Sequence, residues 1–167
     1  MQNVTAARHN ASLQFPVILA GLAGGLIEVA WIWFYGSFAS VSPANIARQI
    51  TYTFLPHAFT GNSAVLLGVG IHLVLSIALA AGFVAVLYGP IARRYGAVGI
   101  FASGLATLSA VWAVNFLVIL PALNPGFPAL MPYAVTLVSK LLFGAAMSWV
   151  LIRGDATTHR QAAVTSR

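Results

Sequence analysis

The sequence contains few of the residues that most catalytic and metal sites use. None of its 167 residues is a cysteine, and only two are carboxylates. The absence of cysteine excludes disulfides, thiolate metal sites and cysteine nucleophiles. The sequence also has no phosphate-binding loop, dinucleotide fingerprint or Ser-His-Asp arrangement. We therefore predict that the chain is not an enzyme and has no metal site.

Charge of either sign is scarce as well. Charged residues make up 6% of the chain and hydrophobic residues 60%, and the mean hydropathy is +0.91. An ordinary soluble domain carries roughly 25% charged residues, so this composition indicates a protein that is embedded in lipid.

A helix needs about 20 apolar residues to cross the hydrocarbon core of a membrane. Four runs are long enough, at residues 15–39, 63–88, 97–120 and 133–152. We predict an all-α, integral membrane four-helix bundle over residues 15–152. It follows a cytoplasmic N-terminal segment, 1–14, and precedes a disordered cytoplasmic tail, 153–167. The first run is longer than the roughly 7–15 apolar residues of a signal peptide, so we expect it to be a span.

The arginines predict the orientation of the bundle. With four spans, one side of the membrane holds Arg8, the pair Arg93 and Arg94, and the tail that begins at Arg153. The opposite side holds only Arg48. By the positive-inside rule, both termini are cytoplasmic. We expect Arg93, Arg94 and Arg153 to face anionic lipid headgroups, and we expect no nucleic-acid partner because the arginines form no single basic face.

Two connections on the outer side have recognisable patterns. Ser42 and Pro43 are a good N-cap and first helical residue, and they predict a short helix in the first outer loop. Apolar residues follow at four-residue spacing, at Ile46, Ile50 and Phe54. This helix is expected to lie flat at the interface. The third connection, 121–132, holds four of the eight prolines and is predicted to run as an extended cap over the outer end.

Each predicted span contains one strongly polar residue: Glu28, His72, Asn115 and Lys140 in turn. We count 1.5 Å per residue from the outer helix ends. Glu28 and His72 then lie about 14 Å deep, Lys140 about 10 Å and Asn115 roughly 7 Å. The four side chains are thus predicted to form a buried polar layer in the outer half of the bundle.

Small residues lie three, four or seven positions from the ionisable residues on the same helix. They are Gly21, Gly24 and Gly25 near Glu28, Gly68 and Ser76 near His72, and Thr136 and Gly144 near Lys140. Small residues let membrane helices approach closely. We therefore predict that these faces pack on neighbouring helices.

Three hypotheses explain the polar layer. Glu28 and Lys140 can pair, since an unpaired charge in a membrane costs several kcal/mol. Such a pair can hold helices together in an accessory subunit or a homo-oligomer. Alternatively, Glu28 and His72 can carry protons or ions in a small transporter or channel. The third hypothesis is that His72 binds haem or a pigment. Apart from this hypothesis, we expect no cofactor. His57 lies roughly 22 Å from His72 if the chain is helical, so we interpret it as an interfacial residue.

The second run also resembles a pattern in YagU-type small four-helix membrane proteins. The residues that carry the likeness are Gly68, Gly70, His72, Ser76, Gly82-Phe83 and Pro90, with Pro121 and Leu142-Phe143-Gly144 further on. The resemblance implies a multi-pass protein of the bacterial inner membrane. Where that pattern has a histidine before the last aromatic-glycine pair, this chain has Lys140, so a two-histidine site does not carry over.

Overall fold

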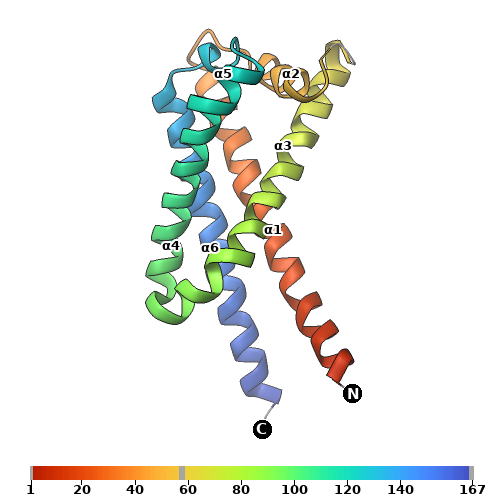
Figure 1. The fold of residues 1–167 in the computed structure, drawn as a ribbon, viewed down its shortest axis with the longest axis vertical. Helices are drawn as coiled ribbons and strands as arrows, with labels where there is room; N and C mark the ends of the chain where they lie inside the picture. The colour runs from red at the N-terminus through yellow and green to blue at the C-terminus, as the bar shows by residue number, and fades with distance from the viewer. Residues whose placement is uncertain (1, 57–58, 166–167) are drawn as a thin grey trace.

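The computed structural model describes residues 2–56 and 59–165, with side chains described for 16–56 and 59–154 (Figure 1). The protein is 88% helical, and no strand is found in the described residues. The all-α fold is thus confirmed. Three helical stretches are long and apolar enough to cross a membrane: Pro16–Gly36, Gly61–Leu123 and Tyr133–Gly154. The predicted interfacial assignment of His57 lies outside the described residues.

Four long helices make up most of the chain: α1 (Gln2–Gly36), α3 (Gly61–Phe83), α4 (Gly89–Val114) and α6 (Tyr133–Thr165). The shorter elements are α2 (Pro43–Phe54), α5 (Leu120–Leu123), the π-helices η1 (Val84–Tyr88) and η2 (Asn115–Ile119), and the 3₁₀ turn η3 (Pro128–Leu130). Both π-helices end two residues before a proline, Pro90 or Pro121. Proline donates no hydrogen bond to the residue four positions earlier, and the wider π turn accommodates this loss.

The stretch Gly61–Leu123 is one continuous helical run, but it does not continue in one direction. The backbone reverses at Gly96, where φ is 58° and ψ is −150°. A positive φ is readily adopted only by glycine, which explains why the reversal falls there. Figure 1 shows α3 descending to this turn and α4 rising from it, with the two helices diverging toward their other ends. The stretch therefore covers the second and third predicted runs.

The long helices pack in the order α3, α1, α6 and α4. α1 packs on both α3 and α6, and α4 packs on α6. α3 and α4 contact each other mainly through η1, near the turn that joins them. The core lies between the packed pairs and includes Leu108, Phe143 and Met147. The open side between α3 and α4 is the feature of the fold that positions the site.

The predicted small residues lie where helices approach most closely. A Cβ atom on Gly21 would lie 2.5 Å from Cα of Ile77, so α1 and α3 are in backbone contact there. Gly25 faces Ser76 of α3, and Gly24 faces the ring of Phe143 on α6.

Two further glycines of the predicted set lie at other contacts. A Cβ on Gly144 would lie 2.9 Å from the carbonyl oxygen of Gly104, at the crossing of α6 with α4. Gly68 packs against Ala47 of α2, so it brings α2 close to α3. Small residues therefore lie at every major helix pair of the bundle.

The short helix in the first connection begins as predicted. Ser42 Oγ accepts a hydrogen bond from the backbone N–H of Asn45 at 3.4 Å, and Pro43 follows at the first helical position. α2 lies across the end of the bundle (Figure 1). Its Ile46 is buried, so this face of the helix packs on protein.

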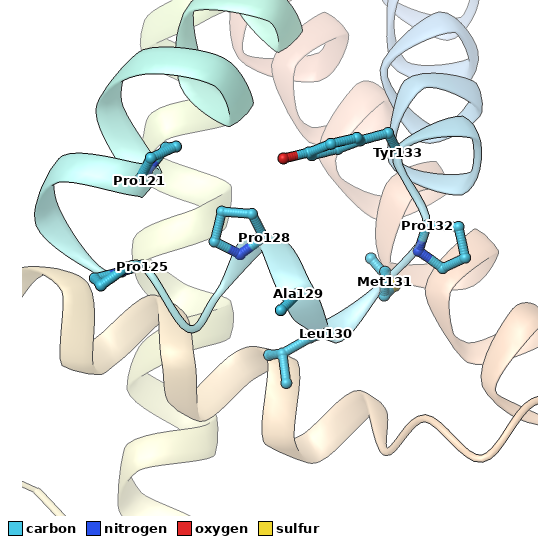
Figure 2. Close-up of a pocket in the computed structure, with 8 residues that line it drawn as sticks. All are labelled: Pro121, Pro125, Pro128, Ala129, Leu130, Met131, Pro132 and Tyr133. Atoms are coloured by element: carbon cyan, nitrogen blue, oxygen red, sulfur yellow. The ribbon is translucent and has the colours of Figure 1, made fainter.

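The proline-rich connection 121–132 covers the same end as α2. The prediction that this connection is extended is only partly correct, because it contains two short helical segments, α5 and η3. Proline favours the first positions of a helix, which explains these segments. The Asn124 amide donates to Gln49 Oε1 at 3.0 Å and to Thr53 Oγ1 at 3.2 Å. Figure 2 shows the prolines of this connection around a hollow that Tyr133 borders. The hydrogen bonds of Asn124 attach the connection to α2.

The tail beyond residue 152 differs from the predicted disorder, because α6 continues to Thr165. No proline follows Pro132, and alanine, arginine and glutamine favour helix. The start of α1 and the end of α6 lie at the same end of the molecule as the reversal at Gly96 (Figure 1).

Candidate functional site

Glu28 is the centre of a buried polar cluster between α1 and α6. Its side chain accepts a hydrogen bond from Lys140 Nζ at 2.8 Å on Oε2, which is also an ion pair, and one from Ser139 Oγ at 3.1 Å on Oε1. Glu28 is 3% exposed. Both carboxylate oxygens are therefore bonded, which lowers the cost of burying the charge. The two ionised residues that the sequence places at similar depth are in direct contact.

His72 of α3 completes the cluster from the other side of Glu28. Its Nε2 lies 3.7 Å from Glu28 Oε2 and 3.2 Å from the carbonyl oxygen of Gly25. A carbonyl can only accept, so we assign the proton of the neutral ring to Nε2. His72 becomes a salt-bridge partner of Glu28 when it takes a second proton. Ser76 lies one turn further and donates to the His72 carbonyl at 2.8 Å.

Thr136 links the cluster to α4. The Ser139 hydroxyl also lies 2.8 Å from the Thr136 carbonyl oxygen, so its one proton is shared between this oxygen and Glu28 Oε1. The indole N–H of Trp112 donates to Thr136 Oγ1 at 2.9 Å. Thr136 is almost fully buried. In the part of the chain whose side chains are described, no buried side-chain nitrogen or oxygen lacks a partner. The network is therefore complete without an added ligand.

Asn115 is the predicted layer residue that the structure leaves outside this network. It is half-buried, and its amide makes no hydrogen bond to the cluster within residues 16–56 and 59–154. By helix count it lies about 7 Å nearer the outer end than Glu28, which is more than one turn. Trp112, three residues earlier, is the α4 side chain that bonds to the α6 network.

A cavity of about 870 Å³ lies between α3 and α4, on the side of the bundle where these helices do not pack together. Apolar side chains from α1, α2, α3, η1, α4 and η2 form most of its wall. Its polar lining residues are Glu28, His72, Ser76, Thr107, Asn115, Thr136, Ser139, Lys140 and Thr53. The cavity thus brings all four predicted layer residues to one surface.

The cavity is open at the side of the molecule. Several of its lining residues are also exposed on the outer surface, including Leu75, which is 43% exposed, and Val86, which is 69% exposed. Ile46 and Ile50 of α2 line its other part, so α2 covers one end. The polar cluster is therefore accessible from the side of the molecule.

Two observations bear on the metal and haem hypotheses. No group of three or more histidine, cysteine or acidic residues is found where the structure describes the side chains. His72 Nε2, the nitrogen that faces the cluster, already donates to the Gly25 carbonyl. An axial ligand would have to give up this hydrogen bond.

The arginines whose side chains are described lie toward the two ends of the molecule. Arg93 and Arg94 are exposed beside the reversal at Gly96, and Arg94 stacks on Tyr95 at 5.5 Å from the ring centroid. Arg153 is exposed and lies 4.4 Å from the Trp149 ring. At the end covered by α2, Arg48 Nε donates to the Gly61 carbonyl at 3.5 Å.

Sequence reasoning missed two parts of the site. Ser139 directly precedes Lys140 and so is not among the small residues three, four or seven positions from an ionisable residue, yet both Ser139 and Lys140 reach Glu28. Gly104 was not singled out, although it meets Gly144 and Ser148 where α4 crosses α6. Gly104 lies near the middle of the third predicted run, where small residues are common, so the sequence gives no signal that distinguishes it.

Comparison with protein-family models, with curated proteins and with solved structures finds no match to this chain. The functional argument therefore rests on the cluster and the cavity.

Proposed function

We propose that this chain is a non-enzymatic, multi-pass protein of the bacterial inner membrane that binds a small hydrophobic molecule in the cavity between α3 and α4. In this proposal four segments cross the membrane, both ends are cytoplasmic, and α2 lies at the outer interface. The apolar surface and the arginine distribution support this topology, and the resemblance to YagU-type proteins supports the location.

The cavity is the observation that carries the proposal. Small-molecule sites in proteins are mostly apolar hollows of about 300–1,000 Å³ with a few polar groups, and this cavity has about 870 Å³. A further transmembrane helix is about 30 Å long and at least 10 Å wide, so its volume exceeds roughly 2,000 Å³. The cavity volume therefore favours a small molecule over a docked helix.

The Glu28–Lys140 pair has two roles in this proposal. It holds α1 against α6, and it gives the cavity a polar wall that orients the polar group of the bound molecule. Lys140 uses one hydrogen bond for Glu28, and an ammonium group has three donors. Two donors remain for a ligand.

A second candidate function is proton-linked transport through Glu28 and His72. The observation that favours it is the 3.7 Å separation of His72 Nε2 from Glu28 Oε2 at the cavity wall. The roles as an accessory subunit or a homo-oligomer stay predictions. Native mass spectrometry of the gently extracted protein tests these two roles.

The test of ligand binding uses two glycines on α3. A side chain added at Gly82 or at Gly70 meets no atom within 4 Å, but only Gly82 lines the cavity. We expect Gly82→Phe to fill the cavity and reduce the amount of co-purifying small molecule, or the binding of an added long-chain alcohol, at least tenfold. Gly70→Phe is the matched control and should bind as the wild type does. Equal binding by Gly82→Phe and the wild type would refute the proposal.

A further inference from the structure

The charges of the cluster restrict which molecules the cavity can hold, if the proposed binding function is correct. We propose that the bound molecule is a long-chain weak acid, whose proton passes to Glu28 while its carboxylate takes over the hydrogen bond of Lys140. This inference rests on the proposed function and specifies the chemical class of its ligand.

The first step of the argument is the net charge of the site. Glu28 and Lys140 are the two ionised residues that line the cavity within the described part of the chain, and together they are neutral. His72 is the remaining titratable residue of the lining, on α3, and α4 and η2 contribute only neutral side chains, such as Thr107 and Asn115. While His72 is neutral, an anion that entered alone would leave one uncompensated negative charge within the membrane, which costs several kcal/mol. An acid that enters with its proton adds no charge.

The second step is where the proton and the hydrogen bonds go. The O–H bond of the acid breaks, and a new O–H bond forms on Glu28 Oε2, the oxygen that faces both Lys140 and His72. Lys140 then donates to the ligand carboxylate, and the neutral Glu28 carboxyl can donate to it as well. Glu28 Oε1 keeps its hydrogen bond from Ser139. One carboxylate and one ammonium are present before and after the transfer.

The third step is the space for the hydrophobic chain. From His72 the cavity wall continues along α3 and η1 to Val86, which is 14 residues or about 21 Å further along the helix. Half of the hydrocarbon core of a bilayer is about 15 Å thick, so a chain that fits one leaflet also fits this wall. Leu79, Phe83 and Val86 make the wall apolar, and the open side lets the chain enter from the bilayer.

The same reasoning excludes a phospholipid headgroup as the preferred ligand. A phosphodiester is ionised throughout the physiological pH range and brings no proton to Glu28. Its binding would leave the cluster with a net negative charge. A neutral long-chain alcohol fits the cavity but gains no ion pair with Lys140, so it should bind more weakly than the acid.

The experiment compares palmitic acid with 1-hexadecanol, which has the same chain length, on the purified full-length protein in nanodiscs. We expect the acid to bind at least tenfold more tightly. The dissociation constant for the acid should rise about tenfold per pH unit above the pH at which free acid ionises, because the bound state retains the proton. NMR of palmitic acid labelled with ¹³C at the carboxyl carbon tests the proton transfer. At a pH where the unbound acid in the bilayer is protonated, the carboxyl carbon of the bound acid should have the chemical shift of a carboxylate.

Two variants separate this inference from the proposed function. The double variant Glu28→Gln/Lys140→Met keeps the site neutral but removes the proton acceptor and the ammonium. We expect it to lose the tenfold preference for the acid over the alcohol. If the wild type binds acid and alcohol equally, or binds the acid with the shift of a protonated carboxyl, the acid proposal is wrong and the cavity proposal stands. If the wild type binds neither, both are wrong. The shift measured on the wild type decides the question even if the double variant does not fold.

Discussion

Glu28 and Lys140 are in contact because neither can be buried alone. A single charge in a low-dielectric interior costs several kcal/mol, and an opposite charge at 2.8 Å offsets much of that cost. Ser139 satisfies the second carboxylate oxygen. Glu28 and Lys140 therefore each need the other as a partner. Replacing both should destabilise the protein less than replacing either one alone.

We expect Lys140→Met alone to destabilise the protein by about 3–5 kcal/mol, because it leaves Glu28 buried without its cation. The double variant Glu28→Gln/Lys140→Met should be closer to the wild type, since glutamine and methionine are both neutral. Unfolding of the purified protein in mixed micelles measures both values. A single variant no less stable than the double variant would show that the pair is not coupled.

Helices of this bundle approach each other through small residues on their contact faces. α1 meets α3 at Gly21, where the opposing atoms belong to the backbone of Ile77 and cannot rotate away. α4 meets α6 where Gly104 faces Gly144. The glycines at these contacts therefore determine how closely each pair of helices can pack. A larger residue in place of one of them would push the two helices apart.

Gly21→Val should separate α1 from α3 and cost about 1–3 kcal/mol of stability, the usual penalty for overpacking. Gly70→Val on α3 is the control, because a Cβ there meets no atom within 4 Å. Thermal denaturation of the two purified variants measures the difference. Equal stability of the two would contradict the close contact of α1 and α3.

The whole molecule has two different ends. α2 and the connection 121–132 cover one end, and the other end holds the reversal at Gly96 together with the beginning of α1 and the end of α6 (Figure 1). The exposed Arg93, Arg94 and Arg153 lie toward the second end. This asymmetry supports the proposal that the second end is cytoplasmic.

Single-cysteine variants can test this orientation directly, because the natural chain has no cysteine. Phe38 is 80% exposed near α2, and Tyr95 is 62% exposed beside the reversal. In spheroplasts, a membrane-impermeant maleimide should label Phe38→Cys at once, and Tyr95→Cys only after the membrane is permeabilised. The opposite pattern would invert the proposed topology, and labelling of both without permeabilisation would contradict it.

Much of the fold follows from local patterns in the sequence. The apolar runs correspond to the long helices, with the second and third joined by the turn at Gly96. Ser42 caps α2 as its position before Pro43 predicts. The tail beyond residue 152 is the clearest departure, since its polar composition predicts disorder although its residues favour helix. Polarity and helix propensity are separate properties, and here the second agrees with the structure.

Local sequence alone dictates that this chain is helical, that it is apolar enough to lie in a membrane, and that its rare charges require partners. These properties depend on neighbouring residues and on the cost of transfer from water to lipid. Only the tertiary structure decides that Lys140 and Ser139 reach the same carboxylate, that Trp112 rather than Asn115 joins the network, and that α3 and α4 leave a cavity between them. These features depend on helix rotation and on which helices pack together, and the resulting contacts lie up to 112 residues apart in the chain.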